Sequence, residues 1–405
     1  MQTKALLTGC VVFLALIFLT PTAFASNVGR RFPSEKRTFK DEVTGLTVTA
    51  LTTDPANDSK IYQTHAQWTS DGRYIIFRSN RMSGGGRGSQ AFAIHEESGE
   101  IIQLTEGSTG TGSLNVARKS NKLYFFRGGW RQRRQLIELN LDPLFTDSKT
   151  GTMKDPNSYE RVIMTMPEGM RESGGFCLDA DETKAYIGVR GQDRDSGGIR
   201  SIDLETGEIE KVLDVDFRMG HVQSNYWVPG EIIYCHETGG DAPQRTWFCK
   251  ADGSVNEPLY VETPDEWVTH EVCVDANHVI FNVMAHLPRL RTKPTGIFCI
   301  NIRTKEVQAL GQVEGRGFWH SAGSTDGKWA VGDTFTGDIY LINRLTGERT
   351  LLTTGHRMRP DHAHPNFSPD GKWILFQSGL LSDGKSLDLM TVELPPARDN
   401  PSNDN

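Results

Sequence analysis

Short apolar stretches recur along the chain at a spacing of about 45 to 60 residues, and a polar turn precedes each one. The clearest copy runs from Ser368-Pro369-Asp370-Gly371 into Trp373-Ile374-Leu375-Phe376. Asp-Gly favours the positive φ angles of a tight hairpin turn. The β-branched and aromatic run that follows is typical of a strand buried on both faces. Seven copies are found, over residues 68–77, 120–126, 179–187, 227–234, 274–281, 324–331 and 368–376.

A second turn signal, with glycine at its centre, follows several of these copies. It occurs at Gly99, Gly207, Gly253 and Gly347 and is expected before an outer strand. Helical periodicity is almost absent. A repeat of this length, built from strands and tight turns, is typical of a four-stranded propeller blade. The sequence therefore predicts an all-β fold, a seven-bladed β-propeller.

The two ends of the repeat region complement each other. The stretch 43–52 alternates like an outer strand but has no blade of its own, and the last copy ends before an outer strand. We expect Leu46 to Thr52 to complete the blade that contains Lys372 to Phe376, which would close the ring and remove its exposed edges. This organisation predicts one propeller domain over 41–395, a polar lead-in over 26–40 and a disordered tail over 396–405. The insert 142–159 is expected to be a surface loop.

The chain of 405 residues is 37% hydrophobic and 23% charged, with a net charge of -7, and no charged block points to nucleic acid. Residues 1–25 have the form of a signal peptide: Lys4, an apolar run, and Ala23-Phe24-Ala25 as a cleavage site. The apolar run is short for a spanning helix, so no membrane anchor is expected after cleavage. We therefore expect a periplasmic or secreted protein.

Removal of the signal takes away one of the six cysteines, Cys10. No C-x-x-C pair among the other five points to zinc. Buried thiols are expected, with Cys235 and Cys249 as the best candidates if a disulfide forms.

The eleven histidines are unevenly distributed relative to the repeat. Symmetry-related positions in a ring converge on its axis, so histidines in one register predict a histidine-lined funnel at the channel mouth. His362 and His364 are two residues apart, so in an extended segment they face one site, as metal ligands or as donors to an anion. A pair of surface loop histidines is the alternative. The histidines just before or on an innermost strand are His65, His221, His270, His320, His362 and His364.

His236 differs because it follows the buried strand of the fourth copy, and Arg245 begins the next strand. An imidazole beside a guanidinium suits proton abstraction next to a carboxylate. A hairpin-loop histidine with a solvated arginine is the alternative that this pattern leaves open.

Several of these segments together resemble one family. They are Gly220-His221, Tyr234-Cys235-His236-Glu237, Arg245-Thr246-Trp247, Thr269-His270-Glu271, His320 and His362-Ala363-His364-Pro365. In this order they resemble oligogalacturonate lyase, a family of seven-bladed propellers that cleave short pectin fragments by β-elimination. The resemblance covers roughly residues 40–392.

The resemblance implies His236 as the base, assisted by Arg245, and a divalent cation, expected to be manganese, held by His270, His362 and His364. The family's fourth ligand is a Gln, and that position here is Arg359, which cannot coordinate a cation. The cation would then be held by three histidines plus water, or by a further ligand from elsewhere. His65, His221, His320 and Arg359 are expected to contact substrate.

The chemistry of a uronide agrees with this interpretation. Elimination requires the carboxylate beside the weakly acidic C5 proton to be neutralised by a metal or arginine, while a neutral histidine acts as base. We therefore expect a lyase that cleaves uronate-containing oligosaccharides by metal-assisted β-elimination, as a monomer or weak oligomer. The alternative is a non-catalytic exported propeller that binds a protein or glycan partner, which leaves the axial histidines unexplained.

Overall fold

The computed structural model describes residues 26–82, 88–129, 133–191, 193, 195–285, 287–290, 295–315 and 317–395. The predicted signal peptide, 1–25, and the predicted tail, 396–405, lie outside the described residues. Within the described ranges, no helix has the length and hydrophobicity needed to cross a membrane.

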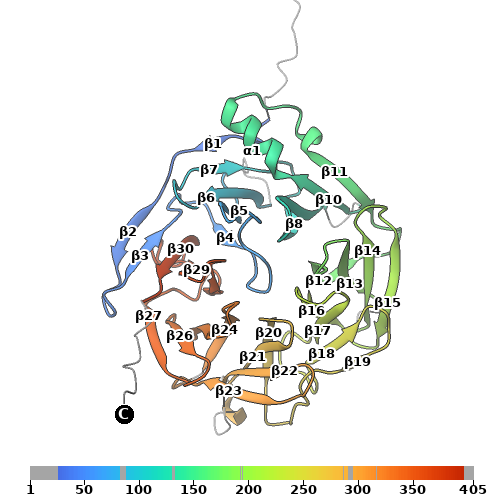
Figure 1. The fold of residues 1–405 in the computed structure, drawn as a ribbon, viewed down its shortest axis with the longest axis vertical. Helices are drawn as coiled ribbons and strands as arrows, with labels where there is room; N and C mark the ends of the chain where they lie inside the picture. The colour runs from blue at the N-terminus through green and yellow to red at the C-terminus, as the bar shows by residue number, and fades with distance from the viewer. Residues whose placement is uncertain are drawn as a thin grey trace, which may run out of the picture.

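The described residues form seven antiparallel sheets arranged in a ring (Figure 1), which confirms the predicted seven-bladed propeller. We number the blades from the one that contains β4. Blades 1 to 3 consist of β4 (Asp58–Lys60), β5 (Tyr74–Ser79), β6 (Gln90–His95) and β7 (Ile101–Gln103); β8 (Thr111–Val116), β9 (Lys122–Arg127), β10 (Gln135–Asn140) and β11 (Glu160–Thr165); and β12 (Glu172–Leu178), β13 (Lys184–Arg190), β14 (Gly197–Asp203) and β15 (Ile209–Val215).

The remaining blades repeat this order from the channel outwards. They consist of β16 (Met219–Ser224), β17 (Glu231–His236), β18 (Thr246–Lys250) and β19 (Asn256–Pro258); β20 (Val268–Cys273), β21 (His278–Val283), β22 (Gly296–Asn301) and β23 (Val307–Gly311); β24 (Phe318–Gly323), β25 (Trp329–Thr334), β26 (Ile339–Asn343) and β27 (Arg349–Thr353); and β28 (Asn366–Phe367), β29 (Trp373–Ser378) and β30 (Asp388–Glu393).

Each sequence repeat is the turn from the innermost strand to the second strand, followed by that second strand. In blade 7, Gly371 has φ 70°. The Ser368 hydroxyl donates to the Asp370 carboxylate at 2.7 Å and accepts from the Trp373 N–H at 3.0 Å. These bonds satisfy the turn's polar groups locally, so the next strand can be buried entirely between blades.

Apolar clusters fill the spaces between neighbouring blades. Phe126 of β9, for example, packs edge to face against Phe176 of β12, with ring centroids 5.3 Å apart. Removal of such a buried ring typically costs about 3–5 kcal/mol. The blades are therefore held at fixed angles, which fixes the positions of their innermost strands around the channel.

The ring closes as predicted. Strand β3 (Thr47–Ala50) pairs with β30, with Val48 opposite Val392, and so supplies the outer strand of blade 7. The lead-in 26–40 also contains strands, which was not expected. β1 (Arg31–Phe32) pairs with β7, and β2 (Arg37–Lys40) pairs with β3, so blades 1 and 7 each gain a fifth strand. These short, largely polar edge strands lack the apolar run by which the inner strands were recognised.

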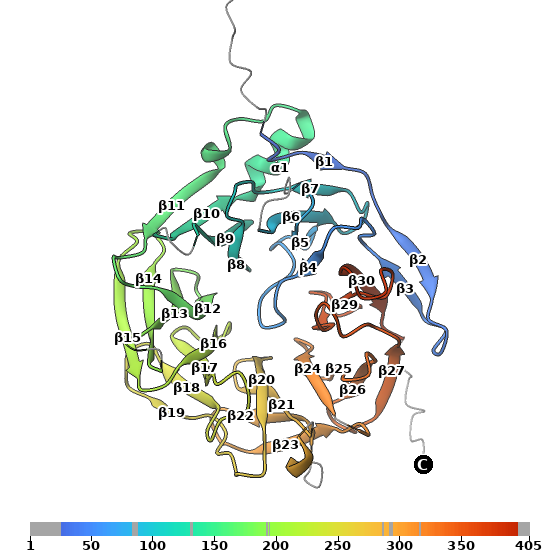
Figure 2. The same cartoon turned by 180° about the vertical axis from the view of Figure 1, so that it is seen from behind.

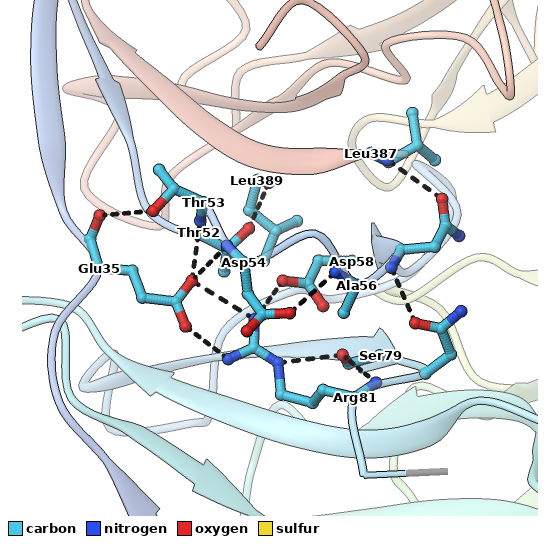
Figure 3. A network of polar contacts seen from close by, with 12 residues as sticks. Glu35, Thr52, Thr53, Asp54, Ala56, Asp58, Ser79, Arg81, Leu387 and Leu389 are labelled. Atoms are coloured by element: carbon cyan, nitrogen blue, oxygen red, sulfur yellow. Dashed lines mark hydrogen bonds and ion pairs between the residues drawn. The ribbon is translucent and has the colours of Figure 1, made fainter. Parts of the chain in front are cut away.

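A buried polar network secures the closure (Figure 3). The Arg81 guanidinium donates to Glu35 at 2.7 Å, to Ser79 Oγ at 3.1 Å and to the Asp58 carboxylate. The Asp58 N–H donates in turn to the Leu387 carbonyl of blade 7 at 2.9 Å. Because Arg81 is 7% exposed, loss of one partner would strand a buried charge. The network therefore fastens the lead-in and blade 1 to blade 7.

The insert 142–159 is not a loop, which corrects the prediction. It forms helix α1 (Leu141–Thr150) and the 3-10 helix η1 (Pro156–Tyr159); a second 3-10 turn, η2, covers Pro288–Leu290. Helix α1 buries Leu141, Leu144, Phe145 and Ser148, a helical spacing that the polar composition of the insert concealed. Phe145 stacks on Tyr74 at 4.0 Å, so the helix covers the outside of the ring near blade 1.

The five cysteines among the described residues are free and buried, as expected. Cys235 lies opposite Thr246 and Cys249 opposite Ile232, so the two candidate partners are not cross-strand neighbours.

Candidate active site

Innermost strands in successive blades share an irregularity at the same place. Pairing with the second strand shifts register between Gly112 and Asn115, between Gly220 and Gln223, and between Thr269 and Val272. Within or beside these bulges the backbone is left-handed, a conformation that non-glycine residues rarely adopt. Residues with positive φ on the innermost strands or just before them include Ser113, Gly174, Gly175, His221, His270 and His364. The bulge turns its side chain towards the channel, which explains why histidines occur in this register.

Five histidines from blades 4 to 7 form one cluster, the histidine half of the channel mouth. His320 is at its centre: its ring centroid is 4.1 Å from that of His270, 3.8 Å from His364 and 5.4 Å from His362. The His221 ring is 6.0 Å from that of His270. The predicted funnel histidines on β16, β20 and β24, and the pair before β28, are therefore brought together.

Asp333 of β25 organises this cluster from behind. Its carboxylate accepts the His320 N–H at 2.7 Å and the Ala363 N–H at 3.2 Å, which fixes both histidine-bearing segments. One ring nitrogen each from His320 and His362 and a carboxylate oxygen of Asp333 lie within 4.8 Å of one another.

The donor set fits a divalent cation. Nδ1 of His320 and Nδ1 of His362 are buried and have no hydrogen-bond partner among the described residues. Buried polar atoms normally form hydrogen bonds, so two ring nitrogens without one, beside the Asp333 carboxylate 3.4 Å from Nδ1 of His320, have the character of metal ligands. Imidazole and carboxylate together suit first-row cations, including manganese.

His270 has a defined tautomer. Its Nδ1 is bonded to the Trp319 carbonyl, which only accepts, so Nδ1 carries the proton and Nε2 keeps its lone pair. Burial, followed by the positive charge of neighbouring His320 and His221, holds the pKa of His270 well below its usual range. His270 is therefore a neutral imidazole with a free acceptor nitrogen.

Arg245 lies in a buried charged group between blades 4 and 5. It is 4% exposed, its Nη2 is 3.4 Å from Glu237, and its Nε has no partner among the described residues. Burial alone would lower the pKa of Arg245, but the neighbouring thiol and the carboxylates Glu271 and Glu237 raise it. Glu271 is fully buried, with Oε1 3.4 Å from Nδ1 of His221. The Arg245 guanidinium therefore stays charged, and its Nε–H is available as a hydrogen-bond donor.

His236 faces away from these groups. Its ring stacks on Phe217 with centroids 4.5 Å apart, on the side of β17 that carries Tyr234 and packs towards blade 3. Side chains alternate along a strand, so the neighbouring Cys235 and Glu237 face Arg245 instead. Burial and then the charge of Arg245 lower the pKa of His236.

The other two residues predicted to contact substrate, Arg359 and His65, lie in different surroundings. Arg359 is exposed, on the segment before His362. His65 is in the connection between β4 and β5, with Nδ1 2.7 Å from Thr64 Oγ1 and Nε2 bonded to the Phe176 carbonyl at 2.8 Å. That connection runs into the middle of the ring, and both views show it there (Figures 1 and 2).

The same connection carries Tyr62, which the sequence pattern did not single out. Its ring centroid is 5.1 Å from that of His364, 5.7 Å from His221 and 5.9 Å from His320. Gln63 beside it accepts from Nδ1 of His364 at 2.8 Å, leaving Nε2 of that ring 3.2 Å from Asp361. Residues of the β4–β5 connection thus form the floor of the site and contact the histidine rings.

A cavity of about 440 Å³ opens beside His221 and extends across blades 1 to 3. We call this region the basic half of the mouth, because Arg78, Arg190 and Arg218 line it. Glycine is required at one edge: a Cβ on Gly174, at φ 89°, would lie 2.4 Å from the Met219 carbonyl oxygen. The cavity and the histidine cluster share His221 and Tyr62, so they form one continuous site.

The fold and the site together define the class of protein. It is a seven-bladed propeller that carries a histidine cluster, a buried arginine and an adjoining basic cavity at its channel mouth. No model of a known protein family matches the chain. Curated relatives are nevertheless found along nearly its whole length: an oligogalacturonate lyase of Dickeya dadantii (strain 3937) is 24% identical over 407 aligned positions, covering 88% of this chain and 96% of that protein. An oligogalacturonide lyase of Pectobacterium atrosepticum is 22% identical with the same coverage.

Solved structures agree with the fold. An oligogalacturonate lyase in complex with manganese superposes with a TM-score of 0.76 at 21% identity, covering 92% of this chain and 99% of that one. The oligogalacturonate lyase of Vibrio parahaemolyticus gives 0.75 at 19% identity, with 91% and 99% covered. The resemblance identified from the motifs is therefore confirmed.

Proposed function

We propose that this protein is a lyase that cleaves uronate-containing oligosaccharides, of the oligogalacturonate type, by metal-assisted β-elimination. The observation that carries the proposal is the neighbourhood of His270: a neutral imidazole with a free lone pair, close to a buried arginine and to orphaned metal-type donors. The relatives named above supply the substrate class.

Arg245 would neutralise the substrate carboxylate. Its charge is held by Glu237 and Glu271, and its unpaired Nε offers a donor for a carboxylate oxygen. A neutralised carboxylate makes the adjacent C5 proton more acidic, and a guanidinium is well shaped for this contact.

We assign the base to His270 in place of His236. The Trp319 carbonyl keeps Nδ1 protonated, so Nε2 can accept the C5 proton, whereas the His236 ring is stacked against Phe217 on the other side of its strand. A base must reach the proton that it takes, and the depressed pKa of His270 means that its Nε2 is unprotonated at neutral pH.

His320, His362, His364 and Asp333 would hold the divalent cation, which we propose to be manganese. When bound, the cation would add positive charge where the eliminated substrate builds up negative charge. Asp333 would then take the place left open by Arg359, as a further ligand from elsewhere in the chain. This set replaces His270 with His320 relative to the ligands expected from the motifs.

We also propose that the protein works in the periplasm or is secreted, because residues 1–25 have the form of a signal peptide. A uronate oligosaccharide is the proposed partner, bound by a monomer or weak oligomer.

The test is direct. Purified protein is mixed with a panel of uronate oligosaccharides, and absorbance is followed at the band of the unsaturated uronide product. We expect product from oligogalacturonates, loss of product with a chelator and recovery with added manganese. No absorbance change with any uronate, in protein shown to contain its cation, would contradict the proposal and favour a binding propeller.

A further inference from the structure

The basic half of the mouth contains positive charge that the proposed reaction does not use. Arg78 of β5 lines the cavity, and no described residue forms an ion pair or hydrogen bond with its guanidinium.

An unpaired guanidinium of this kind is costly. Arginine cannot shed its proton, so it must find an anion or remain poorly solvated. The cavity contains one carboxylate, Glu237, and that group is already engaged by Arg245 at 3.4 Å, Arg218 at 3.6 Å and the Gly239 N–H at 2.6 Å. Asp361 raises the pKa of Arg78, against the larger effect of burial, but forms no ion pair with it, so the cavity in front of Arg78 holds no carboxylate within ion-pair distance among the described residues.

The cavity is large enough for a sugar ring. Its volume of about 440 Å³ is within the usual range of small-molecule sites, about 300–1,000 Å³. The space exists because blades 2 and 3 carry Ser113 and Gly174 at the bulge where blades 4, 5 and 7 carry histidine. His221 lines the cavity and lies beside His270, the proposed base. An oligosaccharide bound at His270 would therefore extend directly into the cavity.

We propose that the basic half is a second uronate subsite, in which Arg78 binds the carboxylate of a sugar residue next to the pair being cleaved. Arg190 and Arg218, exposed at the rim, would draw the acidic oligosaccharide in. The inference rests on the proposed function for its substrate class. It makes the protein selective for oligomers of at least three residues that carry a free carboxylate at the third position.

Calorimetric titration with digalacturonate, trigalacturonate and methyl-esterified trigalacturonate tests the subsite in the metal-loaded protein. If the wild type eliminates the oligomers, the titration is done in a His270→Asn background; otherwise the wild type is used. Arg78→Gln is compared with Arg37→Gln, which removes an exposed arginine on the outermost strand of blade 7. Arg78→Lys serves as the conservative variant, and thermal melting checks that each variant is folded.

We expect trigalacturonate to bind at least about tenfold more tightly than the dimer, since one charge-assisted contact is typically worth that much. Arg78→Gln should abolish this preference without changing dimer affinity, Arg78→Lys should retain part of it, and Arg37→Gln should retain all of it. The methyl ester, which also lacks the carboxylate proposed for Arg245, should bind more weakly than the dimer.

Equal trimer affinity in folded Arg78→Gln and Arg37→Gln would overturn the subsite whether or not the protein is a lyase. A preference for the trimer that depends on Arg78, in wild-type protein without turnover, would leave the subsite standing and reject the lyase. No binding of either oligomer to the wild type would reject both.

Discussion

The histidine half and the basic half of the channel mouth are built on the same backbone feature. Ser113 of blade 2, with φ 50°, and His270 of blade 5, with φ 54°, occupy equivalent left-handed bulges on innermost strands. One carries a small side chain and opens onto a cavity, while the other carries an imidazole packed among imidazoles. The propeller therefore supplies equivalent positions around its axis, and the residue at the bulge decides whether a position provides space or chemistry.

The halves also differ in how their charges are compensated. Two fully buried carboxylates lie behind the histidines. Asp333 accepts the His320 N–H and so fixes the strand that carries this histidine, and Glu271 helps to keep Arg245 charged. In the basic half, no carboxylate among the described residues lies within ion-pair distance of Arg78, and Asp361 acts on it only from farther away. Reaction chemistry requires groups held in place by the protein, whereas a binding cavity can leave the matching charge to its ligand.

The largest effect is expected from the proposed base. His270→Asn should lower kcat by about 10³-fold or more while cation content is retained, because it removes the lone pair that accepts the proton. His236→Asn is the matched control and should change kcat less than threefold. Steady-state assays with elemental analysis measure both. Near-complete loss of activity in His236→Asn, with His270→Asn active, would return the base to the position first expected from the motifs.

A metal ligand should behave differently from the base. His362→Ala should lose bound cation and lower turnover by about 10²-fold, and excess manganese should restore part of the rate. His278→Ala removes a histidine at the start of β21, whose Nδ1 lies 2.9 Å from Asp275 Oδ1, and it should retain both cation and rate. Full cation content in the folded His362→Ala protein would contradict the proposed ligand set.

Filling the cavity should convert one half towards the other. Ser113→His places at blade 2 the residue that blades 4, 5 and 7 accept in the same left-handed conformation, so the fold should be retained. We expect KM for trigalacturonate to rise about tenfold, as one charged contact is lost, with KM for the dimer unchanged. Equal changes for both substrates would show that the cavity does not distinguish oligomer length.

The smallest effect concerns pH and the floor of the site. Burial lowers the pKa of His65 from 6.5 to about 4, so below pH 6.5 the unfolded chain binds a proton that the folded protein does not. The free energy of unfolding should therefore fall as pH drops from 6.5 towards 4. The part of this pH slope that His65 contributes corresponds to the uptake of up to about one proton on unfolding. His65→Gln can still donate to the Phe176 carbonyl and should lack that contribution.

Urea unfolding of wild type and His65→Gln at pH 7, 6 and 5 measures this difference. Identical pH slopes in the two proteins would show that His65 is protonated equally in the folded and unfolded states.

Much of the fold could be predicted because the repeat is local. Asp370-Gly371 specifies its own turn, and the apolar run after it specifies a strand buried on both faces. Helix α1 was missed because only its buried positions, among them Leu144 and Phe145, carry the helical signal. Strand β2 was missed because an edge strand exposed on one side needs no apolar run.

The site was predictable as a register and not as a set of contacts. Histidines in one repeat position indicated a funnel, but neighbouring rings depend on blade angles, so the contact between His320 and His364 could not be read from spacing. Asp333 could have been noticed as a carboxylate inside an otherwise apolar strand. Tyr62 could have been noticed beside two polar residues on the connection between β4 and β5. Neither pattern indicates which site its residue will reach.

The sequence by itself determined the seven blades, the closure of the ring by β3 and the register that brings five histidines together, because these follow from local turn chemistry and rotational symmetry. Only the tertiary structure decided that His270 keeps a free nitrogen, that His236 faces Phe217, and that no carboxylate among the described residues forms an ion pair with Arg78. Those properties depend on groups brought together from distant parts of the chain, and burial and electrostatic effects act between them only at short range.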